Sequence, residues 1–217
     1  MQKYKFYHLG AAIFAIVAFS SSSQKFIEEY KKIRVENISH PGAYTTGSRD
    51  ATLKIVEFFD YLCPYCSTVS KNLKSFAEEN PDTVELVFMN LPLDKECNSM
   101  VKNDVHPGAC KLSYAAYCAG RQNKFHEFHD QLFTLQMYFE VVTQDKISKL
   151  ANSLKLDMAA FNNCASSKEI RDVIKKQIEV AKKFDIKHTP TVYINGKRLK
   201  KMPEKEILNA LLQHESF

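Results

Sequence analysis

The chain has 217 residues, of which 45% are hydrophobic and 25% are charged. These fractions are close to globular averages and exclude wholesale disorder, and one domain of about 190 residues is the simplest interpretation of the length. The 30 basic and 25 acidic residues leave a net charge of only +5, which gives no support to nucleic-acid binding. Six cysteines are too few for a small scaffold held together by dense disulfides.

Residues 1–22 differ in character from the rest of the chain. Lys3 and Lys5 precede an uncharged, mostly apolar run over residues 9–19, and small residues follow it. This is the layout of a secretory signal peptide. The run is shorter than the roughly 20 residues that a membrane-spanning helix needs; an uncleaved anchor and a buried core helix are the alternatives. We expect a signal peptide or membrane anchor that delivers all the cysteines to the periplasm or another oxidising, extracytoplasmic compartment.

The next segments indicate a short leader into one domain. Residues 23–48 are polar and then turn-rich, which predicts a solvated helix or linker before a domain over residues 49–217. Residues 52–60 and 83–89 have the β-branched and aromatic composition of strands. Between them, the apolar positions of residues 64–80 repeat at helical spacing. This pattern predicts a βαβ unit with two parallel strands.

A helical block separates this unit from the C-terminal part of the chain. Residues 108–165 contain no convincing strand, and their apolar stripes predict several helices within an insertion over about residues 92–165. Asn195–Gly196, between two short strand-like segments, is a strong hairpin signal because both turn positions need positive φ. A final helix follows. The order βαβ, helical block, ββα places the chain in the α/β class.

The residues that carry chemistry are Cys63, Pro64, Tyr65 and Cys66, where a predicted strand gives way to a predicted helix. A thiolate at a helix N-terminus is stabilised by free backbone N–H groups and by the helix dipole. We therefore expect a redox-active pair in which Cys63 is exposed for attack and Cys66 lies within the helix. The alternatives are a local structural disulfide and half of a zinc site, but no second Cys-x-x-Cys exists.

Three motifs together resemble the thioredoxin superfamily, and within it the DsbA-like branch. They are residues 57–66 (EFFDYLCPYC), residues 122–133 (QNKFHEFHDQLF), and Thr189–Pro190–Thr191 followed by residues 194–196. The chain is also similar to the DsbA-type domains fused to vitamin K epoxide reductase-like membrane proteins. The resemblance covers about residues 41–217 and implies a thioredoxin fold with an inserted helical block.

The resemblance also implies roles for individual residues. It makes Glu57 a buried acid that relays the proton of Cys66; from the strand alone, an exposed edge glutamate is the alternative. It makes the Thr189–Pro190 bond cis, although most X–Pro bonds are trans. Pro64, Tyr65, Thr189 and Pro190 would then line a groove in which an extended substrate segment pairs with the backbone.

The remaining cysteines, which can pair in three ways, are Cys97, Cys110, Cys118 and Cys164. A bond between Cys97 and Cys110 is the simplest closure of the loop between them. Cys118 and Cys164 fall on separate predicted helices, which a disulfide would join. The alternative for Cys118 is a buried free thiol.

Histidines raise two further questions. His126 and His129, beside Asp130, have a spacing that suggests a metal site, but no third ligand is evident, so we expect surface or boundary histidines and no metal. His188, just before Thr189, is either a solvated loop residue or an electrostatic partner of the thiolate.

The predicted function is that of an exported, monomeric thiol:disulfide oxidoreductase that forms disulfides in unfolded exported proteins. It needs no cofactor beyond the Cys63–Cys66 disulfide. The resemblance implies reoxidation by a membrane quinone-linked partner of the DsbB or vitamin K epoxide reductase type. A reductase or isomerase of the DsbC or DsbG type is the first alternative, and a binding module for peptides or metals is the second.

Overall fold

The computed structural model describes residues 20–103, 105–137, 143–202 and 204–215. Most of the segment expected to be a signal peptide or anchor therefore lies outside the described residues. Among the residues that the structure does describe, no helix has both the length and the hydropathy to cross a membrane.

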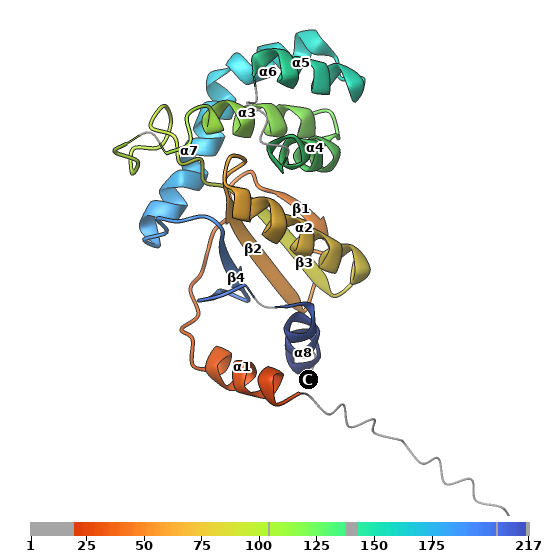
Figure 1. Ribbon diagram of the computed structural model, residues 1–217, viewed down its shortest axis with the longest axis vertical. Helices are drawn as coiled ribbons and strands as arrows, with labels where there is room; N and C mark the ends of the chain where they lie inside the picture. Colours follow the sequence, from red (N-terminus) through yellow and green to blue (C-terminus); the bar gives the residue numbers. More distant parts are fainter. Residues whose placement is uncertain (1–19, 104, 138–142, 203, 216–217) are drawn as a thin grey trace, which may run out of the picture.

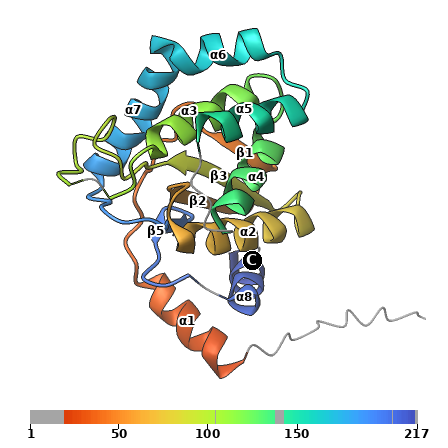
Figure 2. The same ribbon diagram turned by 45° about the horizontal axis from the view of Figure 1, so that its top comes forward.

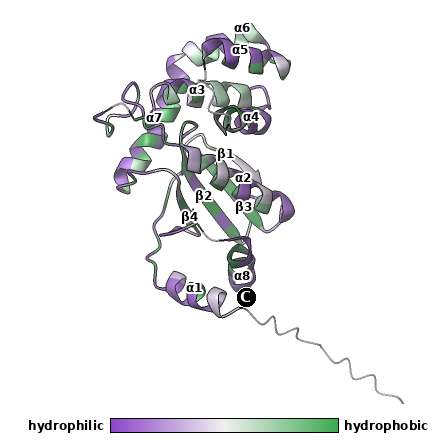
Figure 3. Cartoon of the chain, in the orientation of Figure 1, coloured by the Kyte–Doolittle hydropathy of each residue, from purple (hydrophilic) through white to green (hydrophobic). Residues whose placement is uncertain are grey.

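A mixed sheet forms the centre of the fold (Figure 1). Its five strands are β1 (Tyr44–Gly47), β2 (Leu53–Phe59), β3 (Val84–Asn90), β4 (Thr191–Ile194) and β5 (Lys197–Arg198), in the order β1-β3-β2-β4-β5. As predicted, β2 and β3 are parallel; the other pairs are antiparallel. Strand β2 is central, and all its residues except Lys54 are buried. Figure 3 shows β2 and β3 as largely hydrophobic.

Helix α2 (Pro64–Glu79) connects the two parallel strands, as the βαβ pattern predicted. Its apolar positions Val69, Leu73, Phe76 and Ala77 recur at helical spacing and are all buried. The helix packs on β2, β3 and the helical block. The chain order alone thus places residue 63 at the junction of the central strand and a well-anchored helix.

The predicted helical insertion is present as α3 (Ala109–Gly120), α4 (Phe125–Met137), α5 (Gln144–Ser153) and α6 (Met158–Ser166). Figures 1 and 2 show these helices gathered beyond one end of the sheet. Helix α7 (Lys168–Lys183) then runs from this block back to the sheet, where it packs on β3. The side chains of Thr143, Asp157 and Ser167 cap three of these helices by accepting backbone N–H bonds.

The segment expected to be a helix or linker contributes more to the fold than predicted. Helix α1 (Ser21–Lys31) packs against α8 (Lys205–Glu215), and its buried Tyr30 donates a 3.1 Å hydrogen bond to the carbonyl of Ile194. Strand β1 was not predicted. It is only four residues long and its side chains are half-buried or exposed, so it lacks the apolar alternation by which a strand is recognised.

The hairpin between β4 and β5 turns at Asn195 and Gly196, with φ of 47° and 75° as the dipeptide predicted. A Cβ atom on Gly196 would lie 2.6 Å from the carbonyl oxygen of Glu36, so this position requires glycine for space as well as for conformation. Asn195 also accepts a 2.8 Å bond from the backbone N–H of Lys54, which ties the turn to β2.

Candidate active site

The site begins in the turn that joins β2 to α2. The Asp60 carboxylate accepts a 2.7 Å bond from the N–H of Leu62, and the Asp60 carbonyl accepts a 3.1 Å bond from the N–H of Cys63. Cys63 is the N-cap residue of α2, with an extended backbone, and Pro64 is the first helical residue. Proline suits this position because its missing N–H would have no partner within the helix. The local sequence therefore places the Cys63 sulfur at the positive end of the helix.

The two thiols of the motif lie in different environments. Both are free in the structure, and Cys63 is 7% exposed while Cys66 is completely buried. A hydrogen bond from the Cys66 thiol, followed by backbone N–H groups of Cys66 and Tyr65, lowers the pKa of Cys63 to about 6. Burial, reinforced by the neighbouring Cys63, raises the pKa of Cys66. The pair is thus an acidic outer thiol and a weakly acidic inner one.

The loop before β4 lies against Cys63. The Thr189–Pro190 peptide bond is cis, and the Cys63 Sγ atom donates a 3.4 Å hydrogen bond to the Thr189 carbonyl. This contact explains why Cys63 is more covered than the sequence suggested. His188 is exposed in the same loop, and its carbonyl accepts a 2.7 Å bond from the Thr191 hydroxyl.

A shallow cavity of about 350 Å³ lies beside the cis-proline. Tyr65, itself 60% exposed, lines it, and the other apolar residues of the lining are Pro190, Val192, Leu199 and Met202. The exposed Lys200 and Lys201 also line it. Pro64 is exposed but does not line this cavity. Of the four predicted groove residues, the structure therefore joins Tyr65 and Pro190 in one concave surface next to Thr189.

Glu57 lies on the central strand, opposite Phe88 of β3 and Val192 of β4. It is completely buried, and neither carboxylate oxygen has a hydrogen-bond partner of standard geometry. Burial, with a further contribution from the negative charge of Cys63, raises the pKa of Glu57 to about 8. The same carboxylate contributes to the raised pKa of Cys66. Glu57 is therefore a buried acid that interacts electrostatically with both thiols, and it can exchange a proton near neutral pH.

His129 corrects the expectation of a surface or boundary histidine. It is 1% exposed, and its ring nitrogens lie 2.9 Å from the Tyr61 hydroxyl and 2.9 Å from the Ser70 hydroxyl. Burial lowers its pKa well below the usual range, so the ring is neutral. Through these two contacts, His129 links the turn after β2 to α2. The available signal was its position among Phe125, Phe128 and Phe133 on the apolar stripe of α4. Among the described residues, no group of three potential metal ligands is present.

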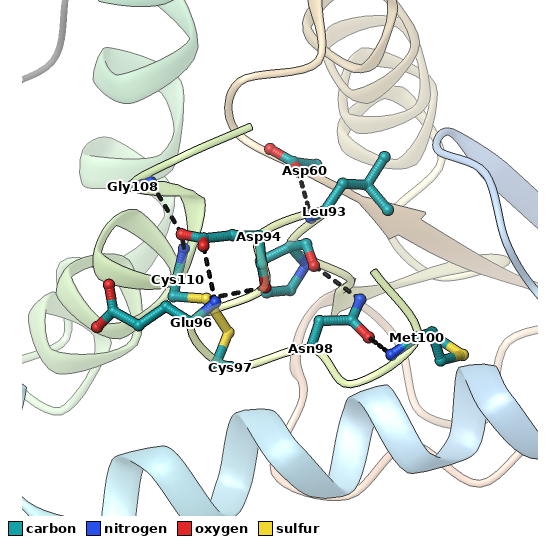
Figure 4. Close-up of a disulfide and its surroundings, with 10 residues drawn as sticks. Asp60, Leu93, Asp94, Glu96, Cys97, Asn98, Met100, Gly108 and Cys110 are labelled. Atoms are coloured by element: carbon teal, nitrogen blue, oxygen red, sulfur yellow. Dashed lines mark hydrogen bonds between the residues drawn. A yellow bond between two sulfur atoms is a disulfide. The ribbon is translucent and has the colours of Figure 1, made fainter. Parts of the chain in front are cut away.

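Two disulfides lie outside the motif. Cys97 is bonded to Cys110 and Cys118 to Cys164, which are the pairings that the spacing favoured. The first closes the loop between β3 and α3, where the Asp94 carboxylate accepts N–H bonds from Glu96, Gly108 and Cys110 (Figure 4). The second joins α3 to α6.

Sequence reasoning missed a further histidine at the site. His106, within the loop that Cys97 and Cys110 close, places its Nδ1 atom 2.9 Å from the Asp60 carboxylate. Asp60 is buried and also accepts a 2.6 Å bond from the N–H of Leu93. No local sequence pattern indicates that His106 belongs to the site, because only the folded loop brings it to the turn before Cys63.

Comparison with known proteins identifies the family. A family model described as thioredoxin matches residues 39–214. The chain belongs to the thioredoxin family. Its matched region includes the Cys-x-x-Cys motif, the helical block and the cis-proline loop, so all three motifs of the sequence resemblance lie within the family's domain.

Relatives and solved structures of this family extend over most of the chain. A probable disulfide bond formation protein D from Bacillus anthracis is 27% identical to this chain, and the match covers 90% of this chain and 93% of the relative's length. The structure of oxidised BdbD from Bacillus subtilis has a TM-score of 0.67 at 22% identity, covering 84% of this chain and 97% of that one. Alpha-DsbA2 from Wolbachia pipientis, a thiol-disulfide exchange protein, has a TM-score of 0.66 at 15% identity. These two structures share the fold, which confirms the predicted thioredoxin fold of DsbA-like type.

The chain is also similar to part of a much longer protein. A Na(+)/H(+) antiporter NhaA 3 from Salinispora tropica is 28% identical over 71% of this chain, which spans only 22% of the antiporter's length.

Proposed function

We propose that this chain is an extracytoplasmic thiol:disulfide oxidoreductase that forms disulfides in exported proteins. One observation carries the proposal: an acidic thiol, Cys63, stands at a helix N-terminus against a buried partner, Cys66, whose pKa is raised. A thiol of low pKa is both a reactive sulfur and a good leaving group in thiol–disulfide exchange. The name and the length of the Bacillus anthracis relative support the same function.

In the forward reaction, a substrate thiolate attacks Cys63 Sγ of the Cys63–Cys66 disulfide. The bond between the two cysteines breaks, a mixed disulfide forms on Cys63, and Cys66 leaves as a thiolate. Because Cys66 is buried and weakly acidic, it takes up a proton, and the buried carboxyl of Glu57, whose charge acts on Cys66, is the candidate donor.

A second substrate thiolate then attacks the substrate sulfur of the mixed disulfide and expels Cys63. Two electrons have passed from the substrate thiols to the protein, and the substrate gains one disulfide. The pKa of about 6 makes the departing Cys63 thiolate stable at neutral pH, which favours the reduced form of the protein and hence oxidation of the substrate. A membrane quinone-linked reoxidase would restore the Cys63–Cys66 disulfide.

The surface around Cys63 suits an unfolded polypeptide. The cavity beside Pro190 offers an exposed aromatic ring, apolar side chains and two lysines, and the Thr189 carbonyl that precedes Pro190 accepts a hydrogen bond from Cys63. An extended segment can place an apolar side chain there while its cysteine reaches Cys63. The two structural disulfides support an oxidising compartment, since such bonds are rare in the cytosol.

The equilibrium potential of the Cys63–Cys66 pair against glutathione tests the direction of the reaction. A value of about −120 mV supports an oxidase, and one of about −270 mV supports a thioredoxin-like reductase. Oxidative refolding of a reduced model protein, with Cys63→Ala as the inactive control, tests the activity itself. Equal refolding rates with the wild type and with this variant would exclude the enzymatic activity and favour the alternative of a binding module.

A further inference from the structure

The loop that Cys97 and Cys110 close reaches back to the active-site turn. His106 lies in this loop, with Nδ1 2.9 Å from Oδ2 of Asp60 and with its backbone N–H bonded to the Leu93 carbonyl at 3.0 Å. The His106 side chain is 21% exposed, whereas the Asp60 side chain is completely buried. The imidazole therefore covers a buried carboxylate and keeps contact with solvent.

Asp60 belongs to the turn that presents Cys63. Its carbonyl accepts the N–H of Cys63, and its carboxylate accepts the N–H of Leu62. The Asp60 carboxylate thus belongs to the same turn as the reactive sulfur, and like-charge repulsion between a carboxylate and a thiolate disfavours the thiolate. A protonated imidazole on the same carboxylate cancels that charge, so His106 removes an electrostatic cost that Asp60 would otherwise impose.

The position of His106 is fixed by the rest of its loop. The buried Asp94 carboxylate accepts the N–H groups of Gly108 and Cys110, and the buried Asn98 side chain donates to the Pro92 carbonyl (Figure 4). The Cys97–Cys110 disulfide closes the loop. These contacts hold the backbone on both sides of His106.

Two negative groups of the active-site turn act on His106. The hydrogen bond and charge of Asp60 raise its pKa, and the negative charge of Cys63 raises it further, against the opposing effect of burial. Asp94, in the same loop, directs its carboxylate at backbone N–H groups. Because the interaction is mutual, a protonated His106 stabilises the Cys63 thiolate to the same extent as the thiolate stabilises the imidazolium.

We propose that His106 is a positioning residue that sustains the Cys63 thiolate by neutralising Asp60, and that the Cys97–Cys110 disulfide holds it there. This inference rests on the proposed role of Cys63 as the nucleophile. It gives the loop disulfide a part in the reactivity of the active site, from outside the Cys-x-x-Cys motif.

The test measures the rate of Cys63 alkylation against pH in the reduced full-length chain. In His106→Asn, the rate at about pH 6 should fall by about threefold, while the rate at about pH 9, where the thiolate is complete, should equal that of the wild type. A purely structural disturbance would change the rate at both pH values. His106→Lys keeps a positive charge and should restore the rate at the lower pH.

Matched variants separate this proposal from its competitors. Cys97→Ala/Cys110→Ala should slow the alkylation of Cys63, as His106→Asn does. Cys118→Ala/Cys164→Ala should not slow it. His188→Asn, which removes the exposed histidine before Thr189, should leave the profile unchanged. The proposal is overturned if the wild type has an acidic Cys63 that His106→Asn does not alter, or if His188→Asn alone shifts the profile. A wild-type chain without an acidic thiol would instead overturn the proposed function, and this inference with it.

Discussion

The Sγ atom of Cys63 donates a 3.4 Å hydrogen bond to the carbonyl oxygen of Thr189, which lies 126 residues further along the chain. This contact joins the reactive sulfur to the loop that an extended substrate segment would approach. The bond requires a proton on Cys63. Oxidation to a disulfide removes that proton and leaves the Thr189 carbonyl able to accept an N–H group from a substrate.

We therefore expect the oxidised protein to bind a cysteine-free peptide more tightly than the reduced protein does. One hydrogen bond of about 1 kcal/mol corresponds to about a fivefold difference in Kd. The difference should be greatest below about pH 6 and should shrink as the pH rises through the pKa of Cys63, because the reduced sulfur then also lacks its proton. Calorimetric titration of both redox forms at two pH values measures this. Equal affinities at low pH would contradict it.

The second prediction concerns the order of the two sulfurs. Cys66→Ala should accumulate mixed disulfides with substrate proteins, because the inner thiol that would release them is absent while the acidic Cys63 remains. Cys63→Ala should trap little, because Cys66 is buried and its pKa is raised. Non-reducing electrophoresis of the trapped complexes distinguishes the variants. Trapping by Cys63→Ala alone would reverse the assignment.

The third prediction follows from the buried acid. The pKa of Glu57 is about 8 in the folded protein, against an ordinary value of 4.5, so the folded state favours the protonated carboxyl. The resulting stabilisation is complete below about pH 4.5 and is lost as the pH rises towards about 8. In Glu57→Gln this loss is absent, and between these limits the variant should gain up to about 4 kcal/mol relative to the wild type.

Urea unfolding of the oxidised proteins at several pH values measures this difference. The oxidised form is required because the Cys63 thiolate of the reduced form has a lowered pKa and stabilises the fold in the opposite direction, increasingly as the pH rises. Burial, the largest cause of the Glu57 shift, is retained on oxidation. Parallel stability curves for wild type and variant would show that Glu57 does not titrate in this range.

The fourth prediction compares the two structural disulfides. The cysteines are 13 residues apart in the first bond and 46 in the second. In the chain-entropy model, closing loops of these lengths stabilises the fold by about 3 and about 4 kcal/mol respectively. Replacing each pair by alanine should therefore lower the free energy of unfolding more for Cys118–Cys164 than for Cys97–Cys110. Denaturant titration measures both. Finding the four cysteines as free thiols in the native protein would remove the basis of the comparison.

Much of the fold was predictable because its signals are local. The periodicity of residues 64–80 predicted α2, the composition of residues 52–60 predicted β2, and Asn195–Gly196 predicted the hairpin. The Cys-x-x-Cys motif at the strand–helix junction indicated where thiol chemistry would occur. Strand β1 escaped prediction because pairing with β3, and not its own composition, makes it a strand.

The sequence by itself determined the helices, the central strands, and the position of Cys63 at a helix N-terminus, because these depend on residues near one another in the chain. Only the tertiary structure decided the environments of the titrating groups. Complete burial on the central strand gives Glu57 its raised pKa, and His129 is buried by α2 and the turn after β2. His106 meets Asp60 across 46 residues. Such contacts join distant segments, and no local pattern encodes the dielectric or the charge that each group will meet.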